Sequence, residues 1–431
     1  MSPQYDRADA IERDSADALA SFRDRFIQPE DALYMDGNSL GLASDASIET
    51  LDRVVEEWKA LAIRGWTDSD PDWFHYGEYL GELVAPLVGA NASEVVVGNS
   101  TTVNIHTLIG TFLDLALAEQ PENTPPPAVL VNDLDFPTDH YAIAAQLTQR
   151  GIDPDEKLRV VESSDGRTIE MDAIIDALET HADISIVFMP SVLYRSGQLF
   201  DLEAITTAAH EADAYVGFDC AHSVGVVPHE LSTVGVDFAV WCSYKYLNAG
   251  PGALAGLYVN KNHFGAEPTL AGWWGHEKAT QFEMNQTFTP AETAGAWQIG
   301  TVSMLSAAPL EGALAVIDEA GIEQIRSKSV ALTDYLITLV DGRLGEVFSV
   351  GTPREPSSRG GHVSIEHPNA KQLSAALREA GVVVDYRPPN VVRLCPSPLY
   401  TRFVDVWDAV ELIRSLADEE VTTVNVDSQV T

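Results

Sequence analysis

Residues 236–252 read VDFAVWCSYKYLNAGPG, and this stretch decides the class of fold. It opens with an apolar run, Phe238 to Cys242, of the kind that forms a buried strand of a parallel sheet. Lys245 follows this strand, where we expect little solvent to stabilise an ammonium ion. Such an environment favours the neutral amine, the form that condenses with an aldehyde to a Schiff base. A lone lysine at a strand end is more often solvated, so other residues have to decide its role.

Asp219 ends an earlier apolar run, in the segment AYVGFDCAHSVG at 214–225. A carboxylate at a buried strand end needs a cationic partner. An arginine elsewhere in the chain would make a structural ion pair. A protonated pyridine nitrogen would instead make Asp219 the acid that sustains an electron-sink cofactor. Together, Lys245 and Asp219 suggest pyridoxal 5′-phosphate.

The middle of the chain alternates between short β-rich runs and amphipathic helical stretches such as residues 201–211. This alternation predicts an α/β fold, a mostly parallel seven-stranded sheet with helices on both faces. The expected strands are residues 95–97, 129–131, 158–161, 184–189, 215–218, 238–242 and 254–259. In such a sheet the residues that follow each strand converge on one ligand site.

The last part of the chain predicts a smaller α+β domain. Its pattern comprises helical stretches within residues 305–340, strands at 362–365, 382–385 and 391–394, and a closing helix from about residue 402. We therefore expect three units: an N-terminal segment (1–44) that packs with the small domain and the active-site cleft, a large domain (45–310) and a small C-terminal domain (311–431).

The chain is strongly acidic, with 65 Asp and Glu against 26 Lys and Arg and a formal net charge of -39. A nucleic-acid partner is not expected, because a phosphate backbone requires a basic surface. Acidic residues spread along the whole chain are typical of adaptation to a high-salt cytoplasm, and an ordinary acidic enzyme is the alternative.

Neither a membrane span nor a disulfide framework is expected. No apolar run reaches about 18 residues, and the acidic N-terminus lacks a signal-peptide core, so the sequence predicts a soluble cytoplasmic protein. The three cysteines, Cys220, Cys242 and Cys395, do not suit a CxxC metal site. We expect no metal and three buried core thiols.

Two segments after strands could complete a cofactor site. Ser100, Thr101 and Thr102 stand where a helix begins and can hold a phosphate at the positive end of its dipole, with an ordinary N-cap as the alternative. Phe136 could cover the face of an aromatic cofactor, or it could be a hydrophobic staple. Asp139 could reach a ring substituent.

Tyr244 precedes Lys245, and its hydroxyl could bond a phosphate or move protons beside the Schiff base. The chain thus presents, in order, a phosphate cup, a ring cover, a pyridinium acid and a lysine. Each segment alone has a structural explanation, and their coincidence favours a pyridoxal-phosphate site.

These motifs resemble those of the kynureninases, within the class V aminotransferase-like group of fold-type I pyridoxal-phosphate enzymes. The matching segments run along almost the whole chain: YMDGNSLGL at 34–42, STTVN at 100–104, DFPTDHYA at 135–142, YRSGQLFDL at 194–202, GFDCAHSVG at 217–225, WCSYKYLNAGPG at 241–252, GWWGHE at 272–277 and VVRLCPSPLY at 391–400. The Asp-x-Ala-His and Ser-Tyr-Lys segments mark the wider group. DGNSLGL, GWWGHE and the Pro-x-Pro-Leu-Tyr ending select the kynureninases.

The resemblance implies hydrolysis of L-kynurenine or its 3-hydroxy analogue, in tryptophan catabolism, to the anthranilate product and L-alanine. It implies that Lys245 holds the cofactor and later removes the Cα proton, while Asp219 keeps the pyridine nitrogen protonated. The remaining cofactor contacts that it implies are Phe136 on the ring, Thr101, Thr102 and Tyr244 at the phosphate, and Asp139 and His222. Tyr244 is also the implied proton donor to the alanyl carbon.

For the substrate, the resemblance implies that Arg393 clamps the carboxylate in a two-pronged pair, with Asn38 nearby. It places Trp66 and His276 near the aromatic end. Trp273 and Thr301 would reach the phosphate from the neighbouring subunit, which implies an obligate homodimer with shared active sites.

Two residues depart from the family pattern: Leu193 stands where an Asn or His is usual, and Pro190 where a Ser or Thr is usual. Two alternatives also remain open. One is a cysteine desulfurase or selenocysteine lyase, which needs a mobile thiolate, whereas Cys395 lies in a strand-like run. The other is a catalytically silent homologue that binds the cofactor.

Overall fold

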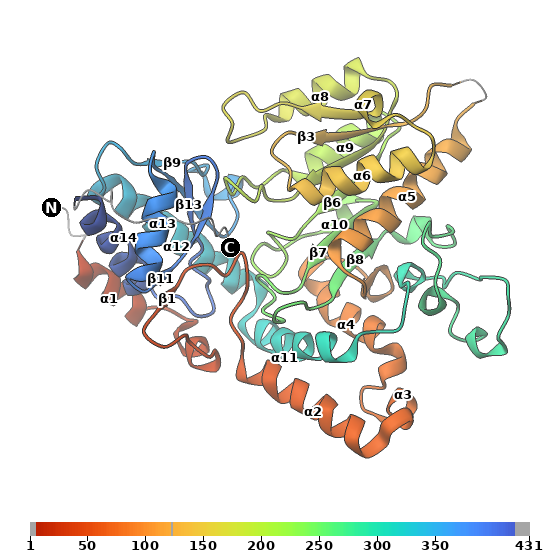
Figure 1. Cartoon of the computed structure of the whole chain (residues 1–431), viewed down its shortest axis with the longest axis horizontal. Coiled ribbons are helices and arrows are strands. Elements are labelled where there is room, and N and C mark those ends of the chain that lie inside the picture. The colour runs from red at the N-terminus through yellow and green to blue at the C-terminus, as the bar shows by residue number, and fades with distance from the viewer. Residues whose placement is uncertain (1–5, 122–123, 419–431) are drawn as a thin grey trace.

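The computed structural model describes residues 6–121 and 124–418 (Figure 1). Its large sheet has seven strands in the order β2-β8-β7-β6-β5-β3-β4, and only β8 runs antiparallel to its neighbours. The strands are β2 (Val95–Val97), β3 (Ala128–Asn132), β4 (Leu158–Val161), β5 (Ile184–Pro190), β6 (Tyr215–Asp219), β7 (Phe238–Cys242) and β8 (Ala255–Val259). The predicted mostly parallel seven-stranded sheet is confirmed.

Helices cover both faces of this sheet, as predicted, because successive strand residues point to opposite sides. Val129 and Val131 pack into one apolar core with α5 and α6, whereas Ala128 and Leu130 pack into another with α8 and α9. The longer helices of this part are α2 (Asp45–Leu61), α4 (Tyr76–Val84), α5 (Thr101–Glu119), α6 (Pro137–Gln149), α8 (Met171–Thr180), α9 (Leu202–Glu211) and α11 (Met304–Ala320). Short ones are α3 (Gly65–Asp68), α7 (Pro154–Lys157) and α10 (Leu231–Val234).

The small domain contains a four-stranded sheet in the order β12-β13-β10-β9, all antiparallel. Its elements are α12 (Ile322–Arg343), β9 (Ser349–Val350), β10 (Val363–Glu366), α13 (Ala370–Glu379), β11 (Val382–Val383), β12 (Asp385–Arg387), β13 (Val391–Leu394) and α14 (Phe403–Asp418). The single strand predicted at 382–385 is wrong. Its first half is β11, which pairs with β1 (Leu33–Tyr34), and its second half begins β12.

The N-terminal segment lies against the small domain, where α1 (Arg7–Ser15) packs beside α14 (Figure 1). The Asp14 carboxylate accepts the backbone N–H groups of Phe403 and Val404 at 2.6 and 3.1 Å, so it caps the start of α14. The apolar residues of α11 and Ile325 pack in the core of the large sheet. We therefore propose that the boundary between the large and small domains lies within α12 rather than at residue 310.

Within 6–121 and 124–418, no helix is long and apolar enough to cross a membrane, and no group of three or more His, Cys, Asp or Glu side chains could hold a metal ion. Cys220, Cys242 and Cys395 are all buried and unpaired, which confirms them as core thiols.

Candidate active site

A cavity of about 330 Å³ lies where the carboxyl ends of the large-sheet strands meet the small domain and the N-terminal segment. It is lined by Asn38, Ser39, Thr101, Thr102, Phe136, Thr138, Tyr194, Asp219, Ala221, His222, Cys242, Tyr244, Lys245, Arg387 and Arg393. The fold therefore brings together most of the site residues predicted from the sequence, from six separate stretches of chain.

Lys245 lies in the loop after β7, and its side chain is partly buried. The predicted near-absence of solvent around Lys245 is thus too strong, because the chain leaves the sheet after Cys242 and Lys245 lines the cavity. Its Nζ lies 2.9 Å from Nε2 of His222. The N-terminal segment supports this loop: the N–H of Gly41 donates to the carbonyl of Tyr244 at 2.8 Å. A Cβ on Gly41 would lie 2.4 Å from the Lys245 carbonyl, so only glycine permits this approach.

Asp219 ends β6 with 8% of its surface exposed, and its Oδ1 accepts the N–H of Ala221 at 2.8 Å. Burial raises the pKa of Asp219, and the charge of Lys245 opposes that rise. Asp139 lies beside it, in the first turn of α6, and its Oδ1 has no hydrogen-bond partner. Burial and the neighbouring Asp219 raise the pKa of Asp139 well above its usual range. This end of the cavity therefore favours a bound cation or a bound proton.

The opposite end is formed by the first turn of α5. Ser100 occupies the N-cap position of this helix, the alternative given by the sequence, but its side chain makes no capping hydrogen bond. Thr102 Oγ1 lies 2.8 Å from Thr138 Oγ1. An uncapped helix start with threonine hydroxyls is suited to an anion such as phosphate.

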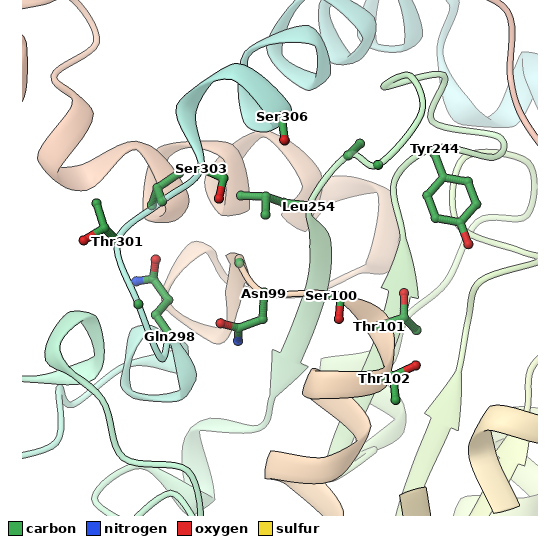
Figure 2. Close-up of a pocket in the computed structure, with 15 residues that line it drawn as sticks. Asn99, Ser100, Thr101, Thr102, Tyr244, Leu254, Gln298, Thr301, Ser303 and Ser306 are labelled. Carbon is green, nitrogen blue, oxygen red and sulfur yellow. The ribbon is translucent and has the colours of Figure 1, made fainter. Parts of the chain in front are cut away.

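A second cavity of about 530 Å³ adjoins the first and shares Thr101, Thr102 and Tyr244 with it. Figure 2 shows these three residues on one side of that cavity and Thr301 on the opposite side. The proximity of Cys242, followed by burial, raises the pKa of Tyr244, so its phenol is protonated at neutral pH.

Phe136 is 48% exposed and lines the main cavity. Its ring meets Tyr194 edge to face, with the ring centroids 5.4 Å apart. It does not pack into the core, so the alternative of a hydrophobic staple is wrong. A half-exposed aromatic ring on the cavity wall is available to stack on a planar ligand.

Arg393, in β13, is 1% exposed and already makes a two-pronged pair with Asp385. Its Nε donates to Asp385 Oδ1 at 2.8 Å and its Nη2 to Oδ2. Nη1 donates to the Tyr194 carbonyl at 2.6 Å. Asn38, with its amide turned so that oxygen faces the guanidinium, accepts from Nη1 at 3.2 Å. Arg393 can therefore meet a ligand only with the edge that faces the cavity.

Sequence reasoning missed several residues of this wall. Asp385 and Arg387 lie in β12, and Arg387 Nη2 is 2.8 Å from Asp385 Oδ2. A strand of three residues gives no signal of such a pair before β12 and β13 are aligned. Ser39, Thr138 and Tyr194 belong to segments that carried the family resemblance, and that membership was the available signal.

Five predicted site residues do not line the cavity around Lys245: Trp66, Asp139, Trp273, His276 and Thr301. Asp139 lines a small hollow together with Asp219 and His222. Trp66 contacts the rings of Trp73 and Trp274, and it lines an apolar hollow of about 400 Å³ together with Thr301. His276 is buried, with Nδ1 accepting the N–H of Thr289 at 3.1 Å. Trp273 is 42% exposed.

The two departures from the family pattern lie beside the site. Leu193 is buried in the main apolar core, and Pro190 ends β5. Pro190 lines a small hollow beside Asp139, Asp219 and His222. An apolar residue at 193 is thus explained by packing.

The chain is similar to several curated proteins along nearly its whole length. A kynureninase of Geobacillus thermodenitrificans is 47% identical to it, covering 94% of this chain and 93% of that protein. A kynureninase of Shouchella clausii is 46% identical, covering 96% and 95% respectively. The family profile described as the kynureninase C-terminal domain matches residues 325–413.

The chain belongs to the kynureninase family.

Solved structures show the same fold at much lower identity. An apo cysteine desulfurase from Thermococcus onnurineus superposes with a TM-score of 0.77 at 18% identity, covering 93% of this chain and 98% of that one. A cysteine desulfurase from Escherichia coli gives a TM-score of 0.76 at 19% identity, covering 93% and 98%. This kynureninase-family chain therefore has the fold-type I architecture predicted from its sequence, and the likeness to the desulfurases shows the fold alone.

Proposed function

We propose that this kynureninase-family chain hydrolyses L-kynurenine, or its 3-hydroxy analogue, with pyridoxal 5′-phosphate as cofactor. The observation that carries the proposal is one cavity that is lined by Lys245, Asp219 and Arg393. Family membership supports the same reaction. Water adds its oxygen to the aryl carbonyl carbon, the bond from that carbon to the alanyl Cβ breaks, and Cβ takes a proton, giving anthranilate and alanine.

The residues of the cavity fit this cofactor. Asp219 is a buried carboxylate that lacks a direct cationic partner among the ion pairs of the described residues, and a pyridinium N–H would supply one. The uncapped start of α5 offers amides and the Thr101 and Thr102 hydroxyls to a phosphate. The exposed face of Phe136 can cover a ring, and Lys245 can reach an aldehyde. When bound, the cofactor supplies an electron sink for carbanions next to the amino group.

The chain's own residues would hold and move the protons of this reaction. Lys245 would take the Cα proton, because its amine faces the cavity with His222 as its hydrogen-bond partner. Tyr244, a phenol kept protonated by its surroundings, would deliver a proton to the alanyl Cβ. Arg393 and Asn38 would orient the substrate carboxylate from the small-domain side.

The desulfurase alternative lacks its nucleophile. Cys242 lines the cavity, and all three thiols, those of Cys220, Cys242 and Cys395, are buried. Burial raises the pKa of Cys395 to about 12, and Cys395 Sγ donates to Tyr246 Oη at 3.4 Å. A protonated, buried thiol directly after β13 cannot act as a mobile thiolate. The intact set of Lys245, Tyr244 and Asp219 argues against a silent homologue.

We also propose that the active unit is a homodimer with shared sites. Trp66, Trp273, His276 and Thr301 lie away from the Lys245 cavity of their own chain. Exposed apolar side chains occur near them, among them Trp58, Phe282 and Leu305. A second copy that covers this surface would bring Trp273 and Thr301 to the phosphate end of the partner's cavity.

Steady-state turnover of both kynurenines by the purified, cofactor-loaded protein tests the function. The assay is run in dilute buffer and in molar potassium chloride. Anthranilate fluorescence and an equal amount of alanine are expected in at least one of these two conditions. Cysteine serves as the control substrate. Sulfide from cysteine without anthranilate from kynurenine would indicate a desulfurase instead. A protein that binds the cofactor but forms neither product would be a catalytically silent homologue.

A further inference from the structure

A buried histidine of the small domain, His362, lies against the lysine-bearing side of the site. It is 0% exposed and directly precedes β10, the strand that pairs with the Arg393 strand. Its ring meets the ring of His222 at a centroid distance of 5.8 Å and an interplanar angle of 60°. His222 in turn contacts Lys245 at 2.9 Å. The three side chains form a line from the small domain to the lysine.

Both imidazoles have unused hydrogen-bonding capacity. Nδ1 of His222 has no hydrogen-bond partner, and neither nitrogen of His362 makes a hydrogen bond of good geometry, although the Arg195 carbonyl lies near this ring. Buried polar atoms normally find partners, so unpaired nitrogens on two adjacent rings call for a common explanation. The site is built tightly around them: Gly197 has φ 78°, and a Cβ there would lie 3.3 Å from Nε2 of His362. The YRSG segment thus packs closely against this ring.

Charge favours two neutral rings. Burial, followed by the charge of Lys245, lowers the pKa of His222 well below its usual value. Burial, followed by the charge of Arg393, lowers the pKa of His362 to about 3, and Asp385 and the Arg195 carbonyl oppose this. Each neutral ring has one N–H and one lone pair. The Lys245 amino group can donate to Nε2 of His222, and in that arrangement His222 carries its proton on Nδ1.

We propose that His362 is a positioning residue that accepts the Nδ1–H of His222 through one water molecule. This bond fixes the tautomer of His222, because the proton on one imidazole nitrogen is set by the partner of the other. Nε2 then stays an acceptor toward Lys245. The proposal rests on the proposed role of Lys245. It adds a residue of the small domain to those that orient the hydrogen-bond partner of Lys245.

The first test reads the tautomer directly. In cofactor-free protein with 15N-labelled histidine, NMR distinguishes the Nδ1–H from the Nε2–H form, and His222→Gln assigns the signals. The wild-type protein is expected to show His222 as Nδ1–H, and His362→Leu is expected to give a mixture. An Nε2–H form in the wild type would overturn the proposal, and so would a tautomer that His362→Leu leaves unchanged.

The second test follows Lys245. Losing one neutral hydrogen bond changes rates by roughly 2- to 10-fold. We expect His362→Leu to change the rate of amine labelling at Lys245, measured by mass spectrometry, and to lower kcat by that factor while KM stays within about twofold. Val363→Ala is the matched control: it opens a buried gap in the same strand, and it should lower Tm without moving either rate.

If His362→Leu does not fold, His362→Asn and His362→Gln take its place. The Asn amide lies near the position of Nδ1 and the Gln amide near that of Nε2, so only one of the two can replace the nitrogen that accepts from His222. Their kcat values should therefore differ, and equal values would overturn the proposal. The tautomer and labelling readouts do not require turnover. A protein that made no anthranilate but gave the expected tautomer and labelling results would therefore fail only the proposed function.

Discussion

Arg393 and Asp385 face each other across adjacent antiparallel strands and form a buried two-pronged ion pair at the wall of the Lys245 cavity. Arg387 shares the same carboxylate. The buried carboxyl group of Asp36 also lies close enough to interact with both guanidinium groups and with Asp385. The edge of Arg393 that faces the cavity is suited to the carboxylate of an amino-acid substrate, and Asp385 holds the Arg393 fork in place for it.

Arg393→Ala is expected to lower kcat/KM for kynurenine by roughly 30-fold to 3,000-fold, because removing one member of a desolvated charge pair costs about 2 to 5 kcal/mol. Arg393→Lys should be nearly as damaging, since a point charge cannot keep both bonds to Asp385 and meet a substrate. Cofactor content, read from absorbance, should stay normal. Near-native kcat/KM, or loss of cofactor from a folded variant, would show that Arg393 is not the carboxylate clamp.

Lys245→Ala is expected to abolish turnover and the covalent attachment of cofactor after borohydride reduction, because its Nζ faces the cavity beside His222. Lys59→Ala is the control, since Lys59 is a surface residue paired with Glu56. Mass spectrometry of the reduced protein locates the modified residue. Reduced cofactor on any other lysine in the Lys245→Ala variant would move the anchor elsewhere.

Mixing two inactive variants tests the shared dimer site. Each proposed site takes Lys245 from one subunit and Trp273 from the other. After random re-forming of dimers from the Lys245→Ala and Trp273→Ala variants, half of the dimers would contain one of each variant and therefore one intact site. Recovery of about one quarter of wild-type activity is expected. Mixing Lys245→Ala with Asp219→Ala is the control, because both lie in the same cavity, and it should recover nothing. Equal recovery in both mixtures would contradict the proposal.

Stability should fall in mild acid through His229, a buried ring whose Nε2 lies 2.8 Å from Ser223 Oγ. Burial lowers the pKa of His229 from 6.5 to about 4 in the folded protein. The folded state binds fewer protons than the unfolded state in this window, so the stability that His229 confers is present above pH 6.5 and is lost toward pH 4. The loss between pH 7 and pH 5 is about 2 kcal/mol.

His229→Gln has no such titration. Its free energy of unfolding, from urea denaturation, should therefore approach that of the wild type as the pH falls from 7 to 5. A constant difference between the two proteins across this range would mean that His229 does not titrate on unfolding.

Salt should stabilise the protein, because a formal net charge of -39 repels itself. The screening length falls from roughly 30 Å at 0.01 M to roughly 3 Å at 1 M salt. Tm is expected to rise with potassium chloride, and dimers should persist better in molar salt than in dilute buffer. Sucrose, which stabilises without screening charge, is the control. An unchanged Tm from dilute buffer to molar salt would contradict the expected adaptation.

The sequence by itself determined the large sheet and the key residues at its edge. Strands of a parallel sheet are buried on both faces, so each appears as a short continuous apolar run such as Phe238–Cys242. Lys245 and Asp219 follow two such runs, and chain order alone brings them to the same sheet edge.

Only the tertiary structure decided the small-domain wall. The run at 382–385 is one apolar pattern in the sequence, yet the chain divides it between β11 and β12, because β1 from the N-terminal segment and β13 compete for its backbone hydrogen bonds. The Arg393–Asp385 pair depends on the register of two strands, and the contact of His362 with His222 joins residues from different domains. Local periodicity reports which residues are buried, whereas the partners of a buried charge or imidazole are fixed only when distant strands align.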